Sequence, residues 1–348
     1  MANSVVGVDI GSDGLRAVEV RDAATSKPTV LRYHSLTLPA GAVARGEVIE
    51  PNTVATVLKE LWVQGGFKSK SVVLGMGNQR VLSRDLSVPK MSLKRIRESL
   101  PFVVQDLLPI PVTDALLDFY PVSESDGENG AQINGLLIAA VKEAVQGNVQ
   151  AVELAGLTPV EVDLIPFALS RVVLRGAATD AALVQVDVGA GTTTVVITLG
   201  GVPQFMRLIP TGGADLTQAL VTRLGIDGEQ AEVLKRTLGL TNPSAPEHIG
   251  AVNVIREVTT ELLNSLRNTI NYFSNTRHDV VATRIVLTGG GAQLRGFAEA
   301  LSELTRVAVS PAVPSGAIQF SRDVDTENFK ATQGAFLVAL GLALGSTS

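Results

Sequence analysis

The chain has 348 residues, of which 45% are hydrophobic, and it carries a formal net charge of −5. This length predicts two or more domains, and the negative charge argues against a general nucleic-acid binder, which needs a basic surface to neutralise phosphates. The absence of cysteine excludes disulfides and thiolate metal ligands, and three scattered histidines argue against a zinc site. No apolar run approaches the ~18 residues of a membrane span and no signal-peptide pattern opens the chain, so we expect a cytoplasmic protein.

The first 80 residues predict an α/β unit. An apolar run at 5–10 contains Asp9 and leads into Gly11, and a second run at 17–20 completes a hairpin with a tight turn. The elements expected next are an extended stretch at 29–38, a helix at 52–64 and a buried strand at 71–76.

The pattern of apolar and polar residues changes over 81–155, which predicts a small α+β insertion. The expected elements are a strand at 81–88, a helix from 92 that Pro101 interrupts, strands at 116–122 and 133–141, and a helix at 142–155. The polar, turn-rich residues 123–130 are expected to form the loop between the last two strands. This insertion is a candidate partner surface, because it adds surface area away from both Asp-x-Gly turns.

The second half of the chain repeats the pattern of the first hairpin. An apolar run at 183–188 contains Asp187, and a β-branched run at 194–198 follows it. The later elements are helices at 216–224, 228–238 and 252–274, a strand at 284–288 that ends in a triple-glycine turn, and an apolar helix at 333–344.

The two Asp-x-Gly turns are the candidate ligand-binding elements. The backbone amides of a glycine-rich turn cradle phosphate oxygens, and a neighbouring carboxylate meets Mg²⁺ through its waters. Two such turns in separate halves of the chain predict two lobes that clasp one nucleotide.

The ordered set of motifs resembles the actin-like ATPase superfamily. Its five features are a first phosphate loop at 9–14, a connecting helix at 163–174, a second phosphate loop at 187–193, an adenosine turn at 289–291 and a closing helix at 334–344. The resemblance covers essentially the whole chain and implies an α/β, actin-like (ribonuclease H-like), two-lobed fold with ATP and Mg²⁺ as ligands.

A closer resemblance is to the PilM family of type IV pilus assembly proteins, which is related to the division protein FtsA. Residues 7–19 are similar to the phrase that opens members of this family. Its recurring phrases are also similar to residues 88–91, 117–120, 141–143, 155–159 and 162–164.

The resemblance implies three structural units. The first lobe takes residues 1–80, 156–181 and 334–348. The insertion takes 81–155 and resembles the 1C subdomain of FtsA. The second lobe takes 182–333, including a helical subdomain at about 216–280 on the adenosine side.

The resemblance also assigns site residues. Asp9 and Asp187 are expected to hold Mg²⁺, mostly through water. The residues expected around the phosphates are Gly11, Ser12, Asp13, Gly14, Arg16, Gly189, Gly191, Thr192 and Thr193. Those expected around the adenosine are Gly212, Gly213, Glu232, Lys235, Gly289, Gly290 and Gly291. For Glu232 and Lys235 the alternative is a solvated helix pair.

Two departures from the family pattern bear on catalysis. Asp13 stands where a small polar residue is usual, so its carboxylate must face away from the phosphates or share the metal, and Arg16 replaces a lysine. Residues 165–168 offer no polar side chain to orient an attacking water, and nearby Asp163 is the one weak catalytic candidate. We expect ATP binding with slow hydrolysis or none.

The family resemblance implies a partner, the cytosolic N-terminal peptide of a PilN-type single-span membrane protein. The protein is then expected at the inner face of the cytoplasmic membrane, held through this partner, where it couples the assembly motor to periplasmic components. Pilus motor ATPases and further copies of the chain are additional candidate partners.

Two alternatives on the same fold stay open at this point. One is an FtsA-like division or cytoskeletal ATPase, although no linker and basic amphipathic helix follow the closing helix. The other is a small-molecule kinase such as a sugar kinase, which needs a catalytic carboxylate in the first lobe.

Overall fold

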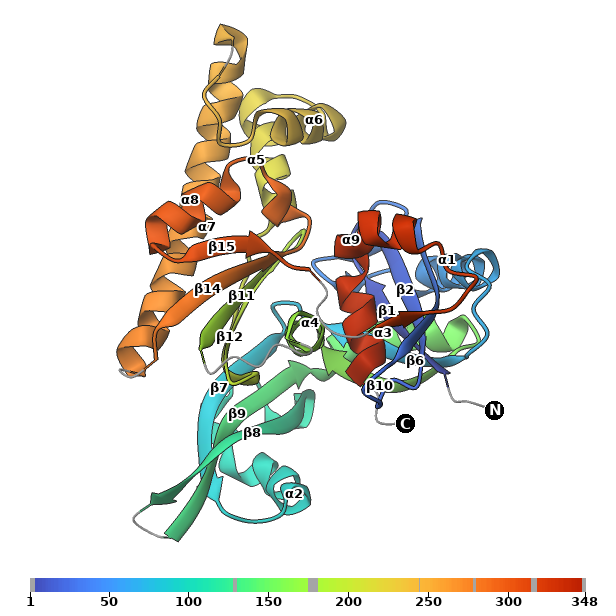
Figure 1. Ribbon diagram of the computed structural model, residues 1–348, viewed down its shortest axis with the longest axis vertical. Coiled ribbons are helices and arrows are strands. Elements are labelled where there is room, and N and C mark those ends of the chain that lie inside the picture. The colour runs from blue at the N-terminus through green and yellow to red at the C-terminus, as the bar shows by residue number, and fades with distance from the viewer. Residues whose placement is uncertain are drawn as a thin grey trace.

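The computed structural model describes residues 4–127, 130–174, 181–243, 245–277, 280–313 and 318–345. These residues form two lobes and an insertion, each with its own sheet (Figure 1). The stretches 1–3, 175–180 and 346–348 of the predicted first lobe lie outside the described residues, as do 128 and 129 of the predicted loop.

The first lobe is built on a six-stranded sheet with the order β10-β6-β1-β2-β3-β16. Its strands are β1 (Ser4–Ile10), β2 (Gly14–Arg21), β3 (Thr29–Thr37), β6 (Ser71–Met76), β10 (Thr158–Leu164) and β16 (Gln319–Phe320). Strand β1 pairs antiparallel with β2 and parallel with β6. A short hairpin of β4 (Val43–Ala44) and β5 (Glu47–Val48) lies outside this sheet.

Both faces of this sheet are covered by helices, which explains why β1 is apolar on both sides. Val6 and Val8 pack with α1 (Pro51–Gln64) and α3 (Lys142–Leu154), whereas Val5 packs with α4 (Ile165–Val173) and α9 (Thr326–Gly345). Helix α9 lies so close to β1 that a Cβ at Gly7 would collide with the carbonyl oxygen of Ala339.

The second lobe is built on a five-stranded sheet with the order β13-β12-β11-β14-β15. The strands are β11 (Ala182–Val188), β12 (Thr193–Leu199), β13 (Val202–Ile209), β14 (Ala282–Thr288) and β15 (Ala308–Pro311). One half of the long helix α7 (Ile249–Thr276) packs on this sheet together with α8 (Phe297–Thr305). The other half packs with α5 (Gly213–Leu224) and α6 (Gly228–Leu238) in a separate apolar cluster.

The insertion is a three-stranded antiparallel sheet, β7-β9-β8, with one helix packed on it. Its elements are β7 (Val81–Pro89), α2 (Leu93–Val103), β8 (Ala115–Gly127) and β9 (Gly130–Val141). Strands β8 and β9 pair as far as Gly127 and Gly130, so most of the predicted loop at 123–130 is a strand arm that projects from the molecule (Figure 1). Short 3-10 turns lie at Gln105–Leu107, Val112–Asp114, Pro246–His248 and Gly291–Gln293.

Two predicted unit boundaries differ from the structure. Helix α3 was assigned to the insertion, but its Ala151 and Val152 pack in the core of the first lobe with Leu58. Residues 326–333 were assigned to the second lobe, but they form the start of α9, where Phe329 packs on Tyr33 of the first lobe. The polar composition of this first turn of α9 hid the helix start, because Phe329 is its one large apolar residue.

Candidate nucleotide site between two hairpin turns

The two Asp-x-Gly turns have the same backbone geometry. The N–H of Gly11 donates to the carbonyl of Gly14 at 3.0 Å, and the N–H of Gly189 donates to the carbonyl of Thr192 at 3.0 Å. Each bond closes a tight turn two residues after an aspartate. The repeated sequence therefore produces a repeated structure, one copy in each lobe.

The carboxylates of Asp9 and Asp187 interact across the boundary between the lobes. The pKa of Asp9 is raised to about 6: burial is the largest cause, Arg16 opposes it, and the charges of Asp187 and Asp13 add to the rise. The Asp9 side chain is only 14% exposed. Burial also raises the pKa of Asp187, and a hydrogen bond from Thr288 opposes this rise. The tips of both hairpins thus bring acidic groups to one place, where the charge of Asp187 disfavours ionisation of Asp9.

Arg16 separates Asp9 from Asp13. Its guanidinium lies 2.8 Å from the Asp13 carboxylate and 3.7 Å from that of Asp9. The Asp13 side chain is 70% exposed, so it faces solvent and pairs with Arg16. A Cβ at Gly11 would lie 2.9 Å from the same guanidinium, so a glycine keeps this part of the turn open.

The second turn packs against the start of α5. Gly213 donates to the carbonyl of Gly189 at 2.9 Å, and Ala214 donates to that of Ala190 at 2.7 Å. A Cβ at Gly212 would collide with the carbonyl oxygen of Ala190. Close approach to the backbone of the second turn therefore requires glycine at 212.

The triple-glycine turn after β14 joins the same cluster. A Cβ at Gly213 would lie 3.5 Å from Cα of Gly291 and 3.8 Å from Nζ of Lys235. Gly289 adopts a φ of +86° and lies against the carbonyl of Val188, where a side chain would collide. The turn after Asp187, the start of α5, helix α6 and the triple-glycine turn therefore meet at one edge of the second lobe.

Lys235 and Glu232 form a partly buried network at this edge. Lys235 Nζ lies 2.5 Å from Glu232, 2.8 Å from the Thr217 hydroxyl and 3.1 Å from the Gly213 carbonyl. Burial alone would raise the pKa of Glu232, but hydrogen bonds from Lys235, Arg236 and Thr217 outweigh it and hold that pKa at about 2. Lys235 contacts the start of α5, so the pair is more than a solvated helix pair.

The remaining predicted phosphate residues differ in exposure. Ser12, Gly191 and Thr192 lie partly exposed at the turn tips, and Gly290, which is predicted at the adenosine, is exposed. Thr193 is fully buried, and its hydroxyl donates to the carbonyl of Thr211 at 2.7 Å. This bond holds β12 to the chain after β13, and the place of Thr193 at a phosphate stays a prediction. Gly14 is also buried and packs against Leu36 of β3.

The Asp163 carboxylate makes structural contacts and is not free to act as a catalytic base. Its carboxylate accepts a hydrogen bond from the Leu164 N–H at 2.7 Å and pairs with Arg171 of α4. The Arg171 guanidinium also donates to the carbonyl of Gly341 in α9 at 3.3 Å. Asp163 thus ties β10 to α4, and Leu164 is the residue at the N-cap of α4.

Four residues at this site were not predicted from the sequence: Thr217, Thr288, Arg45 and Asp215. Thr288 directly precedes the triple-glycine turn, and Asp215 follows Gly212 and Gly213 by two residues, so a closer reading of these motifs would have found both. Arg45 lies in the β4–β5 turn and pairs with Asp215 of the second lobe, which is 170 residues away in the sequence. No local pattern marks it.

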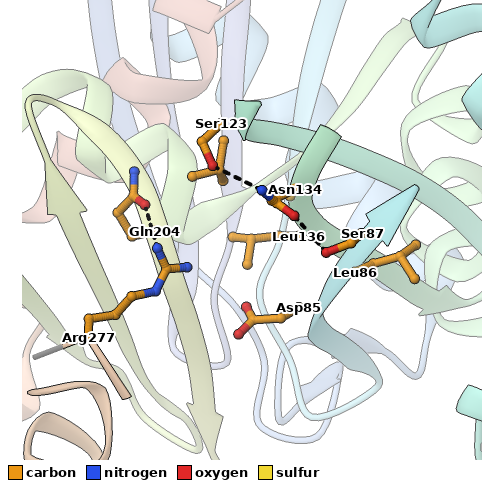
Figure 2. Close-up of a pocket in the computed structure, with 10 residues that line it drawn as sticks. Asp85, Leu86, Ser87, Ser123, Asn134, Leu136, Gln204 and Arg277 are labelled. Carbon is orange, nitrogen blue, oxygen red and sulfur yellow. Dashed lines mark hydrogen bonds between the residues drawn. The ribbon is translucent and has the colours of Figure 1, made fainter. Parts of the chain in front are cut away.

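Two cavities lie beside the insertion, and no residue of the two turns lines either one. A cavity of about 430 Å³ lies between the insertion and α3, lined among others by Arg80, Ile110, Asp114 and Lys142. A second, of about 290 Å³, lies between the insertion and the second lobe. Figure 2 shows Gln204 and Arg277 on one side of this second cavity, with Asp85, Ser87 and Asn134 on the other.

Within the described residues, no helix is both long enough and apolar enough to span a bilayer. The same part of the chain contains no cluster of three or more His, Cys, Asp or Glu side chains arranged to hold a metal ion.

Comparison with known proteins agrees with this architecture. The solved PilM-PilN type IV pilus biogenesis complex contains a chain that is 31% identical, with a TM-score of 0.84 over 98% of this chain and 97% of that one. MreB 5 of Spiroplasma citri bound to AMPPNP matches with a TM-score of 0.54 at 10% identity, over 98% of this chain and 95% of that one, which shows the actin-like fold.

Curated relatives include the cell division protein FtsA. FtsA of Neisseria meningitidis serogroup B is 25% identical over 68% of this chain, and the alignment spans 63% of the division protein's own length. The family model of the type IV pilus assembly protein PilM matches residues 7–347. The chain therefore belongs to the PilM family of type IV pilus assembly proteins.

Proposed function

We propose that this protein binds Mg-ATP between its two lobes and, in that state, presents a groove to the cytosolic N-terminal peptide of a PilN-type membrane protein. The observation that carries the nucleotide site is the convergence of Asp9 and Asp187 from matching turns in separate lobes. The membership of the PilM family supports the setting, which is the type IV pilus machinery.

The donor set at the turns fits Mg²⁺. Asp9 and Asp187 are oxygen ligands, which Mg²⁺ prefers, and a divalent cation between them would offset the burial cost and the repulsion by Asp187 that raise the pKa of Asp9. When bound, the ion supplies positive charge that offsets the phosphates and both carboxylates. The amides at the two turn tips, around Ser12 and Thr192, are the groups we assign to the phosphate oxygens.

The adenosine is assigned to the second lobe. Glu232 and Lys235 are fixed against the start of α5 by Thr217, so their positions are set before any ligand enters. No atom lies within 4 Å of a Cβ built on Gly290, so the backbone there is open to a flat base and a sugar.

Turnover of the nucleotide is proposed to be slow. The start of α4 faces the first lobe with Ile165, whose side chain would lie 2.9 Å from a Cβ built on Gly75 or Gly77. This position is filled by packed apolar atoms, and the nearby Asp163 is paired with Arg171. The described residues at this helix start therefore provide no free group that can orient an attacking water.

The peptide groove is assigned to the cavity between the insertion and α3. It combines apolar walls from Ile110 and Val141 with charges of both signs from Asp114 and Lys142, which suits a short peptide. The solved relative that is 31% identical is a PilM-PilN complex, and this supports a PilN-type partner here. Binding such a partner would hold the protein at the inner face of the membrane.

The insertion also shares an apolar cluster with the second lobe. Leu136 and Ile138 of β9 pack in one cluster with Val196 of β12 and Met206 of β13. Because β12 follows directly from the second phosphate turn, a change in lobe closure on ATP binding would shift the insertion as well. The nucleotide and the peptide are therefore proposed to influence each other's affinity.

The test is a titration of the full chain with a PilN-type N-terminal peptide, with and without Mg-ATP. We expect binding that is tighter with Mg-ATP. Ile110→Asp, which places a charge on the groove wall, should weaken binding at least tenfold, a loss of about 1.4 kcal/mol. Phe102→Asp is the matched control, because Phe102 is 79% exposed on the insertion and does not line the groove.

Absence of peptide binding in both conditions contradicts the proposed partner. Equal effects of the two substitutions contradict the placement of the groove while leaving the partner intact.

A further inference from the structure

An arginine of the first lobe reaches the second lobe beside the phosphate turn. Arg45 Nη2 lies 3.0 Å from Oδ1 of Asp215, in the first turn of α5. Among the ion pairs between described residues, this is the pair that joins the two lobes. The contact therefore crosses the cleft in which the nucleotide is proposed to bind.

The turn that carries Arg45 is built to hold it in this position. Arg45 has a φ of +51°, in the left-handed region that disfavours side chains, and Gly46 follows with a φ of +79°. The buried side chain of Asn78 anchors this turn, because it donates to the Gly46 carbonyl at 3.4 Å and accepts from the Arg80 N–H at 2.9 Å. An unfavourable backbone conformation is maintained by surrounding contacts.

The side chain of Arg45 lies directly on the second phosphate turn. A Cβ at Gly191 would lie 3.2 Å from Cγ of Arg45, so the arginine stem packs where a side chain is missing. Its partner Asp215 is bound to the same region through Oδ2, which accepts from the N–H of Gly212 at 2.8 Å. The guanidinium thus lies at the rim of the proposed phosphate site.

We propose that Arg45 is a phosphate-sensing residue, which leaves Asp215 and binds the terminal phosphate of ATP when the nucleotide enters. This inference rests on the proposed nucleotide site. A guanidinium presents paired N–H donors that match phosphate oxygens, and a dianionic phosphate attracts it more strongly than one carboxylate does. The side chains of Arg45 and Asp215 are 48% and 29% exposed, and an ion pair in contact with water is readily exchanged.

The other end of the hairpin connects to the proposed peptide groove. Glu47 accepts from Arg80 at 3.1 Å, and Arg80 lines the groove. The N–H of Val48 donates to the buried side chain of Asn148 in α3 at 3.2 Å. A movement of Arg45 toward a phosphate would pull on both contacts, so the hairpin links the terminal phosphate to the groove.

The experiment compares Mg-ATP and Mg-ADP affinity of the full chain for wild type, Arg45→Gln and Arg45→Lys. Arg45→Gln should lose about tenfold in ATP affinity, as expected when a charge-assisted contact is removed, and keep its ADP affinity within about twofold. Arg45→Lys should fall between, because it keeps the charge and loses the paired donors. Arg97→Gln is the control, since it breaks a similarly exposed ion pair, with Asp118, on the insertion.

Asp215→Asn provides an independent arm. An asparagine still accepts the hydrogen bond from Gly212 but holds Arg45 less strongly, so ATP affinity should rise while ADP affinity stays constant. In Arg45→Gln, Mg-ATP should also no longer tighten binding of the PilN-type peptide, whereas peptide affinity without nucleotide should be unchanged.

Equal losses for ATP and ADP in Arg45→Gln, or no loss for either, overturn the sensing role while leaving the nucleotide site in place. A wild-type chain that binds neither nucleotide overturns the proposed function itself. The two failures are therefore distinguishable.

Discussion

The charge of Asp187 in the second lobe raises the pKa of Asp9 in the first. The two side chains come from hairpins that are far apart in the sequence, and they act on each other because both lobes direct a carboxylate-bearing turn to one place. Burial of these acidic groups is unfavourable without a cation, and such costs are concentrated at functional sites.

The raised pKa of Asp9 predicts a stability that depends on pH in the nucleotide-free protein. Its pKa rises from 3.8 to about 6 on folding, so the folded state holds a proton that the unfolded state has lost in this interval. Stability from this group is present below about pH 4, is lost as the pH rises to about 6, and is constant above. Asp9→Asn should therefore be more stable than wild type at pH 7 by on the order of 2 kcal/mol, and similar at pH 4.

Denaturant unfolding of both proteins at a series of pH values measures this difference. Asp106→Asn, at an exposed position of the insertion, is the control for the substitution itself. A difference between Asp9→Asn and wild type that is the same at pH 4 and pH 7 would show that Asp9 carries no burial cost.

The Lys235 network predicts a loss of affinity that does not depend on the number of phosphates. Lys235→Met removes the group that binds Gly213, Thr217 and Glu232 together, so affinities for ATP, ADP and AMP should fall alike, by roughly tenfold. Arg236→Gln removes the other partner of Glu232, and the Arg236 side chain is 78% exposed, so it should change each affinity less than about twofold. Titration calorimetry measures the affinities for the three nucleotides. A loss of affinity restricted to ATP would place Lys235 at the phosphates.

Substitutions at two neighbouring glycines should change stability and ATP binding separately. A Cβ at Gly291 would lie 2.5 Å from Cγ1 of Val188, so Gly291→Ala should destabilise the protein by about 1–3 kcal/mol. Gly290 has an ordinary φ of −66° and no atom within 4 Å of its missing Cβ, so Gly290→Ala should change stability by less than about 0.5 kcal/mol. Its methyl group would project beside the proposed adenosine and should weaken ATP binding.

Thermal unfolding and ATP titration of both variants provide the measurement. Unchanged ATP affinity in Gly290→Ala would contradict the placement of the adenosine beside this turn.

The sequence predicted those parts of the site that depend on local pattern. The turns after Asp9 and Asp187, and the triple-glycine turn, follow from strand periodicity and glycine spacing, which act over a few residues. The contact of the Thr193 hydroxyl with Thr211, two residues after the end of β13, depends on strand pairing and has no local signal in the sequence. Arg45 was missed because its position depends on how the lobes pack, and no short-range rule encodes that.

The same contrast between local pattern and tertiary packing explains why two predicted unit boundaries differ from the structure. The first turn of α9 is polar, and only the packing of Phe329 on Tyr33 shows that it belongs to the first lobe. Helix α3 follows the insertion directly in the chain, but its apolar side packs beside α1. Sequence order suggested one neighbour and tertiary packing selected another.

The most direct measurement is a calorimetric titration of the full chain with Mg-ATP, for wild type and Asp187→Asn. The substitution keeps the size of the side chain and removes the charge that the proposed metal requires. The account predicts binding by wild type, at least a tenfold loss in the variant, and a similar loss for wild type when EDTA removes the metal. Equal Mg-ATP affinity in wild type and Asp187→Asn would contradict the proposal that the two turns converge on one magnesium nucleotide.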